Sequence, residues 1–132
     1  MTNLEKRLKL ANEAKDLIIE FREEESRLCE NVLQEIVISE DGSTIYVTET
    51  DSGEEEYRLD QVSCVFETEM RGWGDLLYES IRMAQSEAES EYKRMSKEEY
   101  IQYVGGLYYM EQRCEEIFVR LQQIEEEAEE LL

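Results

Sequence analysis

The first quarter of the chain carries apolar residues at helical spacing. They recur at gaps of three and four from Leu4 to Val32. Thr2 followed by Glu5 matches a capping box, in which a hydroxyl accepts a hydrogen bond from the backbone three residues further on. The pattern predicts a helix over residues 3–33, with acidic residues on its outer face.

The middle of the chain changes to an alternation of period two, which is typical of strands. Asp41-Gly42 is a residue pair that favours a tight hairpin turn. We expect an antiparallel meander with one face in solvent, the third strand being broken near Asp60. Its three strands are predicted at residues 35–39, 43–50 and 56–66.

Helical spacing returns after residues 70–74, which we interpret as a linker. Asp75 is the expected N-cap of a second helix over about residues 75–94. Ser96 with Glu99 forms another capping box and begins a third helix.

The third helix holds the clearest pattern, a heptad seam with uninterrupted gaps of three and four. Val104 and Phe118 widen this stripe, which favours packing within the chain; a homodimeric coiled coil is the alternative. Gly105-Gly106 inside the seam costs ~2 kcal/mol relative to alanine and predicts a kink or break. The seam consists of Tyr100, Tyr103, Leu107, Met110, Cys114, Ile117, Leu121, Ile124, Ala128 and Leu131.

These patterns together predict an α+β fold. An N-terminal helix precedes a three-stranded antiparallel β-meander, and two helices follow, the long C-terminal one being the spine. The three helices are expected to cover one face of the sheet. No internal repeat and no Gly/Ser linker divides the chain, so residues 1–132 are predicted to form a single compact domain.

The net charge of the chain bears on its function more than on its fold. The chain has 34 acidic residues, 14 basic residues and a formal charge of −20. A small domain needs a magnitude of only ~2–8 for solubility, and so large an excess destabilises the compact state by self-repulsion. A basic protein partner would compensate for that cost. Direct binding to nucleic acid or to an anionic membrane is disfavoured.

Residue types for catalysis are few. The chain has no histidine, which removes the usual general base and the commonest transition-metal ligand. It also has no phosphate-binding glycine loop. We therefore expect a protein that is not an enzyme and needs no cofactor.

The three cysteines, Cys29, Cys64 and Cys114, are odd in number and lack CxxC spacing. This argues against a disulfide framework and against a zinc site, and favours reduced thiols in a cytoplasmic protein. The N-terminus does not match a signal peptide, and no apolar run is long enough to span a membrane.

Three carboxylates, Glu49, Asp51 and Glu55, surround the second turn and are close enough in sequence to approach a cation. The stretch lacks the spacing of a calcium loop, so a solvated turn is the preferred interpretation and no metal site is predicted.

Glutamate clusters are the best candidates for a binding site. Carboxylates at one-turn intervals of ~5.4 Å along a helix imitate the spacing of phosphates on one nucleic-acid strand. Trp73 is either a core residue or an exposed anchor. The residues predicted to bind a partner are Glu23, Glu24, Glu25, Glu54, Glu55 and Glu56, with Tyr46, Tyr57 and Trp73 as anchors.

In size, charge and order of elements the chain resembles the small acidic phage-encoded inhibitors of bacterial defence nucleases, anti-CRISPR proteins and DNA mimics among them. No motif carries this resemblance, so it implies no residue roles. The predicted function is non-enzymatic binding to the basic, nucleic-acid-binding surface of a protein. The alternative is a structural adaptor or chaperone-like helical protein, dimeric through its C-terminal helix.

Overall fold

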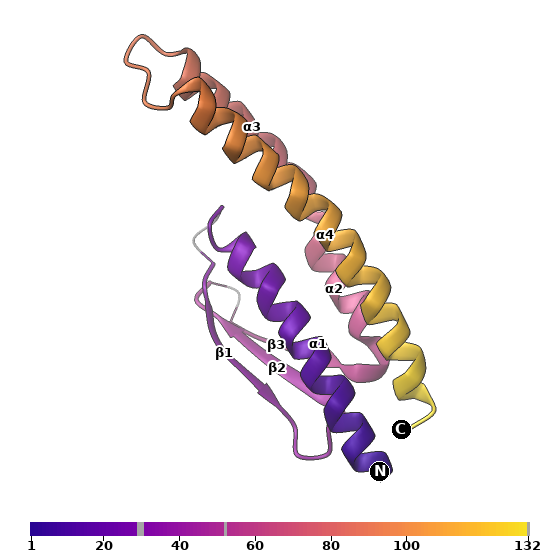
Figure 1. Cartoon of the computed structure of the whole chain (residues 1–132). Helices are drawn as coiled ribbons and strands as arrows, with labels where there is room; N and C mark the ends of the chain where they lie inside the picture. Colours follow the sequence, from indigo (N-terminus) through magenta and orange to yellow (C-terminus); the bar gives the residue numbers. More distant parts are fainter. Residues whose placement is uncertain (29–30, 52, 132) are drawn as a thin grey trace.

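A three-stranded sheet carries helices on one face, and two of the helices extend beyond it as an arm (Figure 1). The computed structural model describes residues 1–28, 31–51 and 53–131. The predicted α+β class and the order of helix, antiparallel sheet and helices are confirmed. The elements are α1 (Asn3–Glu25), β1 (Leu33–Ile38), β2 (Thr44–Glu49), β3 (Gly53–Arg58), the 3-10 turn η1 (Leu59–Gln61), α2 (Val62–Arg71), α3 (Trp73–Glu89) and α4 (Lys97–Glu129).

The sheet is an antiparallel meander in the order β1-β2-β3. Its middle row pairs Val37 with Tyr46 and Tyr46 with Glu56. Because successive side chains on a strand point to opposite faces, one face presents Ile45 and Val47 to the helices, and these two are fully buried. The other face meets solvent, as predicted.

The β1–β2 turn is held against α1. Gly42 has a φ of +71°, and a Cβ there would lie 3.1 Å from the backbone nitrogen of Leu8. Arg7 Nε donates to the carbonyl oxygen of Asp41 at 3.0 Å. The hairpin signal at Asp41-Gly42 is therefore confirmed, and the glycine serves a second purpose, since it lets the turn approach the helix closely.

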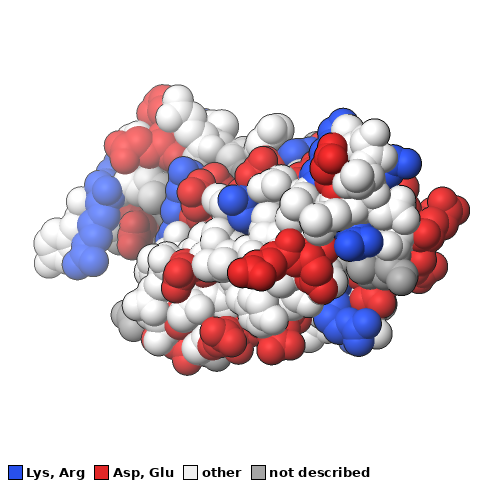
Figure 2. All heavy atoms as spheres, turned by 90° about the horizontal axis from the view of Figure 1, so that it is seen from below, with Lys and Arg blue, Asp and Glu red and all other residues white. Residues whose placement is uncertain are grey.

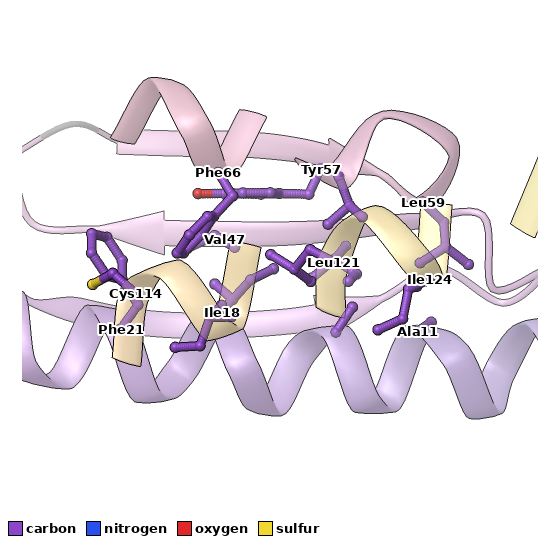
Figure 3. Close-up of a cluster of buried hydrophobic side chains, with 14 of the residues drawn as sticks. Ala11, Ile18, Phe21, Val47, Tyr57, Leu59, Phe66, Cys114, Leu121 and Ile124 are labelled. Carbon is purple, nitrogen blue, oxygen red and sulfur yellow. The ribbon is translucent and has the colours of Figure 1, made fainter. Parts of the chain in front are cut away.

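The core lies between α1, the inner face of the sheet and the C-terminal half of α4 (Figure 3). Phe21 packs edge-on against Phe66, with ring centroids 5.0 Å apart. The heptad seam packs within the chain, because seven of its members are buried. They are Leu107, Met110, Cys114, Ile117, Leu121, Ile124 and Ala128.

The first helix ends earlier than predicted. α1 stops at Glu25, and the backbone N–H of Ser26 still bonds back to Arg22. Residues 32 and 33 pair with the second strand and the residue after it instead. Leu33 pairs with Glu49, and the Thr50 N–H donates to the carbonyl of Val32. Cross-strand pairing thus outweighs the helical spacing of these residues.

The predicted third strand is correct only up to Arg58. Residues 59–61 form η1 and residues 62–71 form α2, a helix that the sequence analysis missed. The buried Val62 and Phe66 are four residues apart, a helical spacing that was hidden within a β-branched run.

The predicted linker at residues 70–74 is helical apart from Gly72, which alone separates α2 from α3. Asp75 is not an N-cap: it lies in the first turn of α3, whose N-cap is Gly72. The two capping boxes are confirmed, because Thr2 accepts from the Glu5 N–H and Ser96 from the Glu99 N–H, each at 3.1 Å.

α4 runs without a break through Gly105 and Gly106, contrary to the prediction. Packing of its buried seam keeps the helix intact against the low propensity of glycine. α3 lies along α4 and not on the sheet, so only part of the helical layer covers the sheet (Figure 1). We call residues 73–109, which comprise α3, the loop and the start of α4, the arm.

Within the part of the chain that the structure describes, no helix is long and apolar enough to cross a membrane.

Candidate partner-binding surface

Four of the nine predicted binding residues point inward. Glu25, Glu55 and Tyr57 surround the guanidinium of Arg22, a residue that the sequence analysis did not single out. Arg22 lies on the buried stripe of α1, and its side chain has no exposed surface. Trp73 is the fourth: it is 3% exposed and lies beside Phe21, with ring centroids 6.1 Å apart.

The guanidinium of Arg22 joins α1 to the sheet and to α2. Its Nη1 lies 3.1 Å from Glu25 on α1, 3.3 Å from Glu49 on β2 and 3.0 Å from Glu69 on α2. Its Nη2 donates to Glu55 at 2.9 Å and to the hydroxyl of Tyr57 at 2.6 Å. We call these six residues the Arg22 network.

Four carboxylates around one cation perturb one another. Burial opposes the charge of Arg22, but Tyr57, Glu69 and Glu49 outweigh it and hold the pKa of Arg22 above its usual value. Burial, followed by a hydrogen bond and the charge of Glu69, raises the pKa of Glu55 to about 7. Burial likewise raises the pKa values of Glu25 and Tyr57. The Arg22 network is therefore a structural centre in which the pKa of one carboxyl, Glu55, is raised to about 7.

These positions correct the predictions for Glu25, Glu55 and Tyr57. Trp73 is the core residue of the two interpretations given above and is not an exposed anchor. Each is used inside the fold, because it lies on the face of its element that packs against other elements. A signal was present in the sequence: Arg22 falls directly after Phe21 on the apolar stripe of α1. A charged residue at such a position needs buried partners of opposite charge.

The three carboxylates of the second turn do not converge there. Glu49 and Glu55 both face Arg22, while Asp51 is exposed. Among the described residues, no group of three or more metal-ligating side chains is placed to hold a metal ion.

The solvent face of the sheet carries three of the predicted binding residues. Glu54 and Glu56 are exposed on β3, and Tyr46 is half-buried on β2. The register places Tyr46 between Val37 of β1, which is 46% exposed, and Glu56 of β3. We define the outer sheet face as Glu35, Val37, Tyr46, Thr48, Glu54 and Glu56.

The outer sheet face has Tyr46 on its central strand, Val37 beside it and carboxylates on both edge strands. One cation, Arg58, follows Glu56 on the same face of β3 and pairs with Asp60 at 3.1 Å. Glu35 lies opposite Thr48, which lies opposite Glu54, so carboxylates stand on both edges of the sheet. Glu54 and Glu56 are ~7 Å apart along their strand, and the outer strands are ~10 Å apart. Neither glutamate is in an ion pair with another residue that the structure describes. Their charge is therefore available to a partner.

The two predicted glutamate clusters do not share a face. Glu23 and Glu24 lie at the end of α1, which packs against the inner side of the sheet, and Glu24 pairs with Arg27 at 3.1 Å. Glu54 and Glu56 point to the opposite side. Figure 2, which shows the end of the molecule where both termini lie, has acidic side chains in separate groups with basic ones between them. The acidity of this face is spread and forms no continuous patch.

The thiols differ in their surroundings. Cys64 is exposed, whereas burial raises the pKa of the buried Cys114 to about 12. Cys29 lies outside the described residues.

Comparison with protein-family models, with curated proteins and with solved structures finds no match to this chain.

Proposed function

We propose that this chain is a cytoplasmic, non-enzymatic binding protein whose outer sheet face occupies a basic, nucleic-acid-binding surface of a protein partner. The observation that carries the proposal is the set of exposed carboxylates Glu54 and Glu56, with Glu35, around Tyr46 and Val37. An apolar centre with a polar border is the usual composition of a protein interface.

Charge supports a basic partner. The arm holds seven acidic and four basic residues, a net charge of −3, so the rest of the chain carries −17 of the total of −20. Border charges of this kind accelerate association with a positive surface and make it sensitive to salt. A nuclease channel that holds nucleic acid is such a surface, and inhibition of a phage-defence nuclease by imitation of its nucleic acid is the specific form we propose.

The experiment compares two triple variants of equal charge. Glu35→Gln/Glu54→Gln/Glu56→Gln removes the acidic border of the outer sheet face. The control, Glu115→Gln/Glu126→Gln/Glu129→Gln, removes three exposed carboxylates of α4. Each immobilised protein is used to capture partners from a bacterial lysate at low salt, with and without competing duplex DNA or RNA.

The proposal expects a basic nucleic-acid-binding protein that is released by nucleic acid and by salt. The sheet variant should bind it ~10–100-fold more weakly, since three exposed charge contacts are worth roughly 0.5–1 kcal/mol each. The control should stay close to the wild type. Equal weakening in both variants would refute the role of the sheet, and a partner that resists salt and nucleic acid would refute the mimicry.

The alternative is a structural adaptor or chaperone-like protein, dimeric through its C-terminal helix, and it would need a face of α4 other than the heptad seam. The seam residues from Leu107 to Ala128 are buried against the rest of the chain and would have to be exposed before they could pair with a second copy.

A further inference from the structure

The face of α4 that points away from the core differs in composition from the rest of the molecule. Residues 100–110 contain no charged side chain, in a chain of which 36% is charged. Ile101 is 57% exposed, Tyr108 53% and Tyr109 67%. The charge recognition proposed for the sheet therefore does not extend to residues 100–110.

Six exposed residues form one stripe on this face. They recur at gaps of four and three, which places them within one side of a helix, opposite the buried seam. We call them the α4 stripe: Lys97, Ile101, Gly105, Tyr108, Gln112 and Glu116.

The α4 stripe is complementary to itself when two copies pair in antiparallel orientation. The register that sets Gly105 of one copy opposite Tyr108 of the other also sets Lys97 opposite Glu116 and Ile101 opposite Gln112. Tyr108 thus meets a glycine, and Lys97 meets Glu116, twice each across a two-fold axis. Glu116 also pairs with Arg113 of its own helix at 3.0 Å, so Lys97 would share its carboxylate. Such matching of one patch with itself is what an isologous dimer requires.

Gly105 supports this packing. A Cβ at Gly105 or at Gly106 would meet nothing within 4 Å, so nothing within the described chain requires a glycine there. A shallow hollow beside Gly105 is lined by Tyr108, Tyr109, Glu111 and Gln112. Glycine in a helix costs about 1 kcal/mol relative to alanine, and close approach of a second helix is a physical reason to keep it.

Net charge also favours the arm as the place where two copies meet. Each copy carries −20, of which only −3 lies on the arm. Contact through the arm, much of which extends beyond the sheet, keeps the two acidic bodies apart (Figure 1). We infer that the α4 stripe is a homodimer interface in which two copies pair antiparallel, independently of the function proposed for the sheet.

The first test is sedimentation of the full chain over a wide range of micromolar concentration. We expect a monomer–dimer equilibrium that dissociates on dilution, because the face of one helix is smaller than a permanent interface. Tyr108→Glu should weaken the dimer roughly tenfold or more, since an unpaired carboxylate is costly to bury. Tyr78→Glu is the matched control, because Tyr78 is a 68% exposed arm residue outside the stripe. A chain that stays monomeric throughout, or two variants that behave alike, would overturn the inference.

A charge exchange tests the register. Lys97→Glu alone and Glu116→Lys alone should each weaken the dimer, and the double variant should restore it. Within one helix these positions are ~28 Å apart, so only contact between copies explains such a rescue. Absence of rescue would overturn the antiparallel register.

Gly105→Ala shows whether the glycine affects dimer formation in addition to the stability of the helix. It should raise the thermal stability of the monomer and weaken the dimer, whereas an unpaired helix face would show only the first effect. Salt distinguishes the two proposals: added salt releases a basic partner from the sheet, whereas it affects the dimer much less, because residues 100–110 at the centre of that interface are uncharged. Either proposal can thus fail while the other stands.

Discussion

Glu55 offers a direct test of the Arg22 network, because its protonation state changes near neutral pH. Its carboxylate accepts a hydrogen bond from Arg22 at 2.9 Å and lies near Glu69 and Glu49, whose charges act on it. Replacement by glutamine keeps an oxygen that accepts from Arg22 and removes the negative charge. The variant therefore imitates the protonated form at every pH.

The pKa of Glu55 is about 7 in the folded protein against an ordinary value of 4.5. This difference determines whether the free energy of unfolding rises or falls with pH. Between these values the folded state binds more protons than the unfolded state. The free energy of unfolding therefore falls as the pH rises from 4.5 to about 7, and the contribution is constant above that range.

The expected difference in stability between Glu55→Gln and the wild type is moderate. The pKa change corresponds to about 3 kcal/mol without screening, at ~1.4 kcal/mol per pH unit. The side chain of Glu55 keeps 26% of its exposure, and water screens its charge, so we expect ~1–2 kcal/mol. Glu55→Gln should match the wild type near pH 5 and exceed its stability by this amount at pH 8.

Urea denaturation at several pH values measures this difference. Trp73 is the single tryptophan and is buried in the core, so its fluorescence reports unfolding of the body. Glu54→Gln, the neighbouring exposed glutamate, controls for the loss of one charge from an acidic protein. If the stability difference between Glu55→Gln and the wild type is the same at pH 5 and pH 8, the reasoning is wrong.

Three further predictions concern stability and reactivity. Gly42→Ala should lower the free energy of unfolding by ~2–3 kcal/mol in urea denaturation, and Gly53→Ala by only ~1 kcal/mol. Both glycines have a positive φ, but only Gly42 lies against the backbone of α1. Equal losses in the two variants would contradict this explanation. Arg22→Met should lower the free energy of unfolding by about 3–5 kcal/mol, because it leaves buried carboxylates without their cation. The loss should be larger at pH 8 than at pH 5. A loss of stability that does not depend on pH would argue against the Arg22 network. A thiol reagent should label Cys64 in the native protein and Cys114 only on unfolding, as peptide mass spectrometry would show; equal labelling rates would contradict the burial of Cys114.

Features that depend on neighbouring residues could be predicted from the sequence. The capping boxes at Thr2 and Ser96 and the Asp41-Gly42 turn are local, since each involves a side chain or backbone group within a few residues. The heptad seam of α4 was recognisable for the same reason. Its period alone defines one face of a helix, and that face is the buried one.

Only the tertiary structure decided what those faces contact. Alternation along β3 points Glu55 to the opposite side from Glu54 and Glu56. Only the tertiary structure shows that Arg22 lies on that side and pairs with Glu55. Packing against the core likewise turned residues 62–71 into a helix and buried Trp73. Packing also carried α4 through Gly105 and Gly106, because contacts between distant segments outweigh local propensities of about 1 kcal/mol per residue.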